Sequence, residues 1–284
     1  MTECVAVSNQ KGGVGKTTTV NAVGAGLFRR GYRVLYVDLD PQGNLSYSLG
    51  IGQLKSGQAT VVDVLTGGAS LEEAIVHTTQ GDLLPFSPSL SKIDTLLPEV
   101  GKEYSLKTAL HQLEAGRDNI SGGTVCESSA SSPESAQTPL AQRIFEPRII
   151  LVDTPPALGT LTVNALTACN SLIIPAQADV FSLQGAGQLI QTIQAVKKYC
   201  NKDLMIRGFL LVRYSSRAVI SRDMTELLEN TAQQLNTKVY NTKIRECVAL
   251  KEAQAKHQDI FTYNVKSNAA EDYDNLIKEI LGEE

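Results

Sequence analysis

The chain has 284 residues, of which 42% are hydrophobic and 20% are charged, and its formal net charge at pH 7 is −4. This is the composition of an ordinary soluble globular protein, and the acidic balance excludes a uniformly basic nucleic-acid-binding protein. The longest apolar runs have the length of a β-strand, well short of the roughly 20 residues that a membrane-spanning helix needs.

In chain order, short apolar runs alternate with segments of helical periodicity. The predicted strands are residues 4–8, 33–38, 82–86, 148–153, 171–176, 207–212 and 238–240. The predicted helices are residues 16–30, 161–169, 183–199, 221–235 and 268–281. Strands that alternate with helices at this spacing predict an α/β fold, a single doubly wound and mainly parallel sheet flanked by helices. Right-handed crossovers then place the functional loops at the carboxyl ends of the strands.

Residues 115–137 interrupt this pattern. The segment is rich in Ser and Gly and has no periodicity, which is typical of a mobile surface insertion, and a predicted strand follows soon after it. We therefore expect residues 1–284 to form one domain. Five scattered cysteines without a Cys-x-x-Cys pair predict reduced thiols, and three histidines far apart in the sequence show no metal-ligand spacing.

A glycine-rich segment follows the first predicted strand and opens the first predicted helix. It reads Gly12-Gly13-Val14-Gly15-Lys16-Thr17-Thr18. This is the context of a phosphate-binding P-loop, in which glycines let backbone N–H groups surround phosphate oxygens at a helix N-terminus. We expect Lys16 to contact the β- and γ-phosphates of a nucleotide and the Thr17 hydroxyl to bind Mg²⁺. A simple glycine turn before a helix would need neither two lysines nor three threonines.

Two acidic motifs follow predicted strands, at the sheet edge where the P-loop is expected. Asp38 and Asp40 come at the end of the second predicted strand, and Asp153 ends the fourth. An apolar strand that ends in Asp is typical of the carboxylate that holds Mg²⁺, and we assign this role to Asp153. Asp40 is the candidate for orienting the attacking water, with Asp38 supporting it or contacting the metal shell. A turn at Asp40-Pro41 and a strand-end cap at Asp153 are the structural alternatives.

The P-loop departs from the ordinary pattern in two positions. Lys11 adds a second lysine ahead of the glycines, and Gln10 stands where an ordinary P-loop has glycine. In this form the segment resembles the deviant Walker A motif of the ParA/MinD class of P-loop ATPases. Further segments resemble the ParA family, the first two its switch I and switch II: residues 38–44, 153–166, 173–185 and 248–254. The resemblance spans nearly the whole chain, with residues 115–137 as the main insertion.

The resemblance implies a ParA/Soj-type chromosome or plasmid partitioning ATPase that uses ATP and Mg²⁺ and turns over slowly without a partner. Lys11 would reach the nucleotide of the other subunit in an ATP-bound homodimer, while residues 12–18 would wrap the phosphates. Thr17 and Asp153 would hold Mg²⁺, and Asp40 would promote hydrolysis. The dimer would bind DNA without sequence preference, and a ParB-type centromere-binding protein would stimulate hydrolysis and release it. A cytoplasmic, nucleoid-associated location is then expected.

Basic residues gather in residues 197–256, which contain twelve Lys/Arg and six Asp/Glu, a local balance of +6. Such an asymmetry is compatible with a DNA-binding face and equally with solvated helix surfaces. Arg217 matches a position where the family often has a DNA-binding arginine, but Ala249 occupies a second basic position of the family. Phosphate contacts need only charge and reach, so nearby basic residues are candidates to replace it: Lys243, Arg245 and Lys251.

Other members of the class fit less well. Residues 272–284 contain five acidic residues and one lysine, so the polar face of this predicted helix is acidic, unlike the basic membrane-binding helix of MinD-like proteins, and no membrane partner is expected. No cysteine lies in residues 157–168, where nitrogenase-iron-protein relatives carry cluster ligands. Because Lys11 lies near the start of the sequence, we expect no N-terminal operator-binding domain. Two other functions stay open: a related ATPase that positions a protein cargo, and a scaffold that binds ATP with little turnover.

Overall fold

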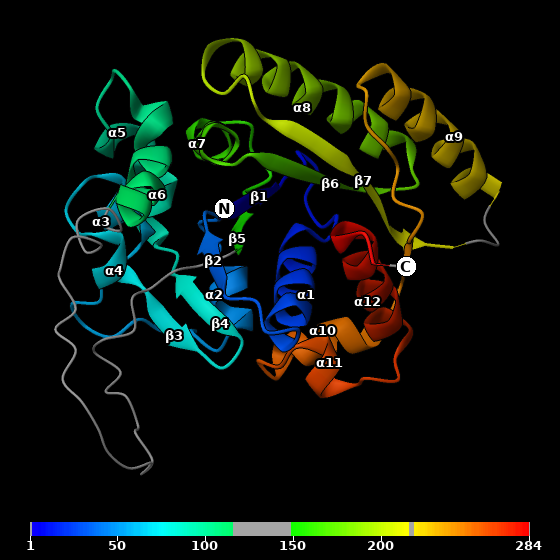
Figure 1. Cartoon of the computed structure of the whole chain (residues 1–284), viewed down its shortest axis with the longest axis horizontal. Helices are drawn as coiled ribbons and strands as arrows, with labels where there is room; N and C mark the ends of the chain where they lie inside the picture. Colours follow the sequence, from blue (N-terminus) through cyan, green and yellow to red (C-terminus); the bar gives the residue numbers. More distant parts are fainter. Residues whose placement is uncertain (1, 116–148, 216–218, 284) are drawn as a thin grey trace, which may run out of the picture.

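The protein is described by a computed structural model, which covers residues 2–115, 149–215 and 219–283. Its centre is an eight-stranded sheet of order β3-β4-β2-β5-β1-β6-β7-β8 (Figure 1). The strands are β1 (Glu3–Val7), β2 (Val34–Asp38), β3 (Val76–Thr78), β4 (Gly81–Leu84), β5 (Ile149–Asp153), β6 (Ser171–Gln177), β7 (Met205–Tyr214) and β8 (Ile244–Arg245). Neighbouring strands are parallel except β3 and β4, which pair antiparallel. The predicted α/β fold with one mainly parallel sheet is confirmed.

The central strands are buried on both faces. In β2, Leu35 and Val37 pack into the hydrophobic cluster on one side of the sheet, while Val34 and Tyr36 pack into the cluster on the other side. All residues of β2 and β5 are buried. A strand that contributes to two cores needs apolar residues at successive positions, which is why these segments read as continuous apolar runs.

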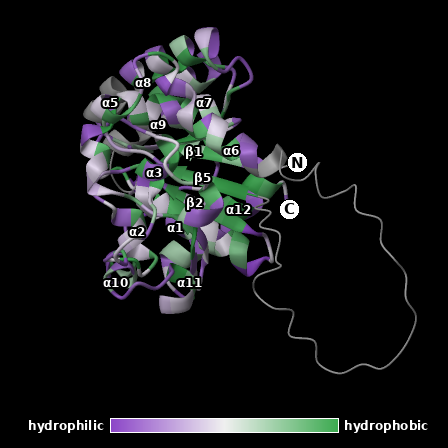
Figure 2. Ribbon diagram, turned by 90° about the vertical axis from the view of Figure 1, so that its left-hand side faces the viewer, coloured by the Kyte–Doolittle hydropathy of each residue, from purple (hydrophilic) through white to green (hydrophobic). Residues whose placement is uncertain are grey.

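Helices cover both faces of the sheet. One layer consists of α1 (Lys16–Arg29), α10 (Val248–Ala255), α11 (Ile260–Tyr263) and α12 (Asn268–Leu281). The other consists of α3 (Val61–Leu65), α4 (Leu71–Ala74), α5 (Ile93–Leu96), α6 (Ser105–Ala115), α7 (Thr160–Ala168), α8 (Val180–Tyr199) and α9 (Val219–Gln234). The short helix α2 (Asn44–Ser48) follows β2, and two 3-10 turns, η1 (Pro88–Lys92) and η2 (Lys102–Tyr104), flank α5. Figure 2 shows the apolar strands between these more polar helices.

The strand order brings three strand ends together. β1 lies between β5 and β6, and β2 lies on the far side of β5. In the register of the sheet, Val7 at the end of β1 is the partner of Asp153, and Asp153 is the partner of Asp38. The loop that follows Val7 is the glycine-rich segment, so it starts beside both acidic strand ends at the carboxyl edge of the sheet.

Most predicted elements are confirmed. Six of the seven predicted strands agree with the structure within two residues at each end, and the five predicted helices within three. The strand predicted at 238–240 is wrong: Val239 makes a single bridge to Phe209, and the strand next to β7 is β8. Pairing stops after this bridge because the next backbone N–H groups, of Asn241 and Thr242, donate to the Glu279 carboxylate instead.

Two further predictions concern the insertion and the C-terminal helix. Ala115 belongs to α6, and residues 116–137 of the predicted insertion lie outside the described residues. α12 packs on α1, where Ile277 reaches so close to Gly26 that a Cβ at this glycine would lie 2.2 Å from Ile277 Cδ1. The apolar face of α12 is thus buried inside the protein. In the described ranges, every helix is too short or too polar to cross a membrane.

Candidate functional site

The glycine-rich segment forms a loop that only glycine can close without strain. Gly13 and Gly15 have φ angles of 73° and 79°, in the left-handed region that disfavours residues with a Cβ. Gly15 is the N-cap of α1, which begins at Lys16. The Gln177 side chain, at the end of β6, donates a hydrogen bond of 3.3 Å to the carbonyl oxygen of Gly13. The loop therefore presents a helix N-terminus toward the carboxyl edge of the sheet, which is the arrangement that binds phosphate.

Lys16 lies inside this loop. Only 7% of the residue is exposed, and Nζ donates to the carbonyl oxygen of Lys11 over 3.2 Å. Burial lowers the pKa of the Lys16 ammonium, and the nearby carboxylates of Asp153 and Asp40 oppose this shift. A buried ammonium is costly unless it meets an anion, so its position fits the phosphate chain of a nucleotide.

Thr17 and Asp153 form the pair expected to hold the metal ion. Thr17 Oγ1 donates a hydrogen bond of 2.6 Å to Asp153 Oδ2. Asp153 is fully buried at the end of β5, and its Oδ1 is one of the few buried oxygens without a hydrogen-bond partner among the described residues. Burial, and then the charge of Asp38, raise the pKa of Asp153 well above its ordinary value. A buried carboxylate oxygen with no partner next to a threonine hydroxyl fits a hard cation such as Mg²⁺.

Asp38 and Asp40 have different surroundings. Asp38 is fully buried, and its oxygens accept hydrogen bonds from the backbone N–H of Asp40 at 3.2 Å and from Ser46, through N–H at 2.8 Å and Oγ at 2.7 Å. Burial raises the pKa of Asp38 to about 6, although these hydrogen bonds lower it. Asp38 thus holds the segment that carries Asp40 and α2, which makes it a positioning residue. Asp38 is also the register partner of Asp153, and its predicted contact with the metal shell stays a prediction.

Asp40 lies at the mouth of the site. It is 8% exposed, and its Oδ1 accepts a hydrogen bond of 2.9 Å from the N–H of Gln42. The turn at Asp40-Pro41 that was considered as an alternative is therefore present, and it holds the carboxyl group near Lys16. The role of Asp40 in orienting water stays a prediction. The structure thus brings together Lys16, Thr17, Asp40 and Asp153 from three strand ends.

Lys11 does not point away from its own chain. Its Nζ donates to Gln177 Oε1 over 3.1 Å and forms an ion pair with Asp179, both at the end of β6. The side chains of Lys11 and Asp179 are 26% and 33% exposed. Within one chain, this lysine therefore rests beside the phosphate loop.

Three residues that contact the site were not predicted from the sequence. Ser46 binds Asp38, Gln177 contacts both Lys11 and the loop, and Gln254 of α10 donates a hydrogen bond of 3.1 Å to Thr18 Oγ1. Gln177 and Gln254 lie in segments that resemble the ParA family, which was the available signal. Ser46 carried no signal, because a serine eight residues after an aspartate fits any turn.

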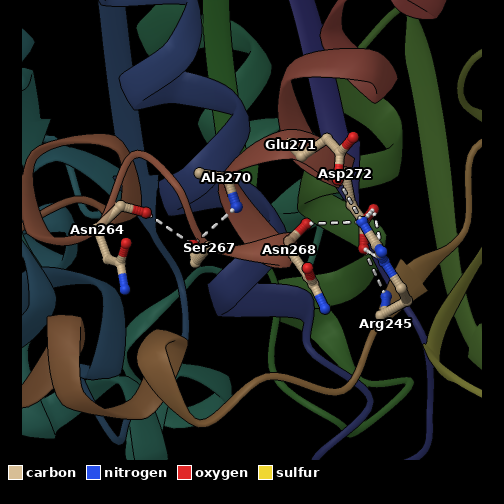
Figure 3. A network of polar contacts seen from close by, with 7 residues as sticks. All are labelled: Arg245, Asn264, Ser267, Asn268, Ala270, Glu271 and Asp272. Carbon is tan, nitrogen blue, oxygen red and sulfur yellow. Dashed lines mark hydrogen bonds and ion pairs between the residues drawn. The ribbon is translucent and has the colours of Figure 1, made fainter.

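The predicted DNA-binding residues differ in their surroundings. Arg245 donates to both Asp272 and Glu271, and its backbone N–H also donates to Asp272 (Figure 3). This network ties β8 to α12, so a phosphate would have to displace two carboxylates. Lys243 lies over the ring of Tyr214 with Nζ 4.6 Å from its centroid, and Lys251 is exposed on α10. Arg217 lies outside the described residues.

Comparison with known proteins agrees with this geometry. The family model described as "AAA domain" matches residues 2–121 and 146–206. The sporulation initiation inhibitor protein Soj of Bacillus subtilis (strain 168) is 36% identical over 283 residues, which cover 99% of this chain and 98% of Soj. The chromosome partitioning protein ParA of Caulobacter vibrioides (strain NA1000 / CB15N) is 32% identical over 283 residues, 99% of this chain and 94% of the relative.

A solved structure has a similar level of sequence identity to this chain. It is cobyrinic acid a,c-diamide synthase from Mycobacterium smegmatis with a bound ATP analogue and magnesium, with a TM-score of 0.74 and 33% sequence identity. The similarity covers 99% of this chain and 95% of that chain. The predicted cofactors, ATP and Mg²⁺, agree with this. With its deviant Walker A loop, its two acidic strand ends and these full-length relatives, the chain belongs to the ParA/MinD family of P-loop ATPases.

Proposed function

We propose that this ATPase partitions DNA. In this proposal an ATP-bound homodimer binds DNA without sequence preference, and hydrolysis, stimulated by a ParB-type centromere-binding protein, releases it. The observation that carries the proposal is the convergence of Lys16, Thr17, Asp40 and Asp153 at one sheet edge, in a chain similar over its full length to partitioning proteins.

Each residue of the site has a distinct task in the proposed hydrolysis. Residues 12–18 and the Lys16 ammonium neutralise and orient the phosphates. Thr17 and Asp153 hold Mg²⁺, which when bound neutralises charge on the β- and γ-phosphates. Asp40, fixed by its turn and by Asp38, orients the attacking water. Lys11 leaves Asp179 and reaches the nucleotide of the other subunit when two copies close on ATP.

The proposed DNA contact uses exposed charge near α10. Lys251 is exposed there, and Lys243 precedes β8 with its ammonium over the Tyr214 ring, whereas Arg245 has carboxylate partners. Contacts of lysine with phosphate are electrostatic, so the binding should weaken steeply with salt and carry little sequence preference. The same cycle on the nucleoid would give the nucleoid-associated location that the family implies.

The test is binding to a random-sequence DNA duplex with ATP, ADP or no nucleotide over a salt series. Binding only with ATP, lost as salt rises, supports the proposal. Lys16→Ala should abolish this binding while the fold is kept, and Asp40→Ala should keep the ATP-bound dimer on DNA because hydrolysis is blocked. A protein that dimerises with ATP but binds DNA in no state would instead position a protein cargo.

A further inference from the structure

We infer that His257 is a positioning residue for ATP hydrolysis, which holds the switch I helix α2 against α10 and so fixes the place of Asp40. The inference needs only the ATPase activity of the family and is independent of DNA binding.

His257 occupies a position where helices usually have glycine. α10 ends with Lys256 as C-cap, and two backbone hydrogen bonds close its last turn: His257 N–H to Gln254 O at 3.1 Å and Gln258 N–H to Ala253 O at 3.0 Å. This is the Schellman motif, whose closing residue takes the left-handed conformation. His257 does so with φ = 54°, a strained conformation for a residue with a Cβ. Glycine would take this conformation with less strain, but it would lose the contacts of the imidazole ring.

What the side chain supplies is a contact with α2. His257 Nδ1 lies 2.6 Å from the carbonyl oxygen of Tyr47, so the N–H tautomer at this nitrogen donates to it. The two rings also meet edge to face, with centroids 4.5 Å apart and planes at 63°. His257 thus binds the outer side of a helix of five residues, which is too short to be stable alone.

The inner side of the same helix is bound by the catalytic segment. Ser46, the neighbour of Tyr47, is bound by the Asp38 carboxylate through N–H and Oγ, and Asp38 also accepts the N–H of Asp40. α2 is therefore clamped between Asp38 and His257. Asp40 and α2 belong to one short segment. If the contact at Tyr47 is lost, α2 can move, and the Asp40 carboxyl group moves with it.

α10 also holds α2 in place relative to the phosphate-binding segment. Gln254, one turn before His257, donates to Thr18 Oγ1 in the phosphate loop. One helix thus contacts the loop that holds the phosphates and the helix that follows Asp40. Hydrolysis needs the water-orienting group in a narrow geometry relative to the phosphate, and small displacements lower the rate strongly. Nucleotide binding, by contrast, depends on the loop itself.

The test compares His257→Gly and His257→Asn with wild type, measuring basal kcat and KM for ATP without DNA or partner. Gly removes the side chain and also the backbone strain, so the thermal stability should stay equal or rise. The kcat should nevertheless fall about 3- to 10-fold with KM unchanged, as expected for loss of a group that acts only on the transition-state geometry. Asn tolerates the left-handed conformation and offers an amide N–H to Tyr47, so His257→Asn should recover at least half of the activity.

Asn236 provides the matched control. It has φ = 52° after α9 and closes the same motif, with Thr237 N–H to Ala232 O at 2.9 Å. Asn236→Gly should change stability in the same direction as His257→Gly and leave kcat unchanged. A kcat of His257→Gly within about twofold of wild type would overturn the inference, as would a fall in kcat that Asn236→Gly shares.

Discussion

Lys11 and Asp179 form an ion pair within one chain. It joins the phosphate loop to the segment that directly follows β6. Gln177 Oε1 accepts a second hydrogen bond from the same ammonium. In the proposed dimer Lys11 contacts the nucleotide of the other subunit, so these contacts compete with dimer formation. The ion pair is thus a small energetic bias toward the monomer.

Asp179→Asn should favour the ATP-bound dimer. The pair is partly exposed, and such pairs contribute at most about 1 kcal/mol. Because both subunits break this pair on dimerisation, the dimer dissociation constant should fall by up to about 30-fold. Sedimentation at several protein concentrations with ATP and Mg²⁺ measures this change. Asp203→Asn, at an exposed position in the turn before β7, controls for the loss of one negative charge. Unchanged or weaker dimerisation of Asp179→Asn alone would show that the pair does not oppose the dimer.

Asp153→Asn should separate stability from activity. The carboxylate is fully buried beside Asp38 and has an oxygen without a partner among the described residues, so its charge destabilises the nucleotide-free fold. Removing the charge should raise Tm by about 2–6 °C, because a gain of about 1–2 kcal/mol has this effect in a domain of this size. ATPase activity should fall by about 100-fold or more, because the metal ion loses a ligand that contributes several kcal/mol. Calorimetry and a phosphate-release assay test the two effects, and a lower Tm would contradict the first.

Arg245→Ala and Lys251→Ala should affect different properties. Without Arg245, the buried Asp272 loses its principal cation, and we expect a cost of about 1–2 kcal/mol in folding with little change in the salt dependence of DNA binding. Without Lys251, the fold should be unchanged, and the slope of log K against log salt should become less negative by about 1 for each Lys251 that contacts phosphate, or about 2 for the dimer. Urea unfolding and DNA titrations at several salt concentrations distinguish them. A salt slope that becomes less negative in Arg245→Ala would show that Arg245 also contacts DNA.

Glu279→Gln should destabilise the protein in a pH-dependent manner. Burial raises the pKa of Glu279, but hydrogen bonds from the N–H groups of Thr242 and Asn241 and from Lys238 outweigh it, so the net shift is downward from 4.5. A depressed pKa means stability that is present above about pH 4.5 and is lost as the pH falls below it. The variant should lose about 1–2 kcal/mol at pH 7, and its difference from wild type should shrink as the pH falls from 4.5 through the depressed pKa of Glu279 to about pH 3. Urea unfolding at both pH values measures this, with Glu226→Gln on the exposed face of α9 as the control.

The parts of the fold that the sequence predicted are those in which local pattern and packing agree. Strands such as β2 are buried on both faces and therefore appear as apolar runs. The helix α10 was not predicted because only Ala249 and Ala253 are buried in it, and polar contacts such as that of Gln254 hold it in place. The pattern at 238–240 predicted a strand, but the Glu279 carboxylate ends the pairing there from a distant part of the chain.

The site shows the same division. The glycines and the strand-end aspartates could be predicted from the sequence, because their expected roles follow from residue type and from position at the carboxyl edge of the sheet. The contacts of Lys11 could not be predicted, since Asp179 lies 168 residues away and comes near only through the order of β1 and β6. The supporting role of Asp38 likewise depends on Ser46, whose neighbourhood is set by the turn at Asp40.

The two edge strands of the sheet are short. β3 has three residues and β8 has two, and β8 is further joined to α12 by the Arg245 network. Edge strands this short offer few unpaired N–H and C=O groups to another chain. If copies of the protein gather on one DNA molecule, as we propose, these edges disfavour joining of their sheets into a continuous ladder, and association would depend on other surfaces.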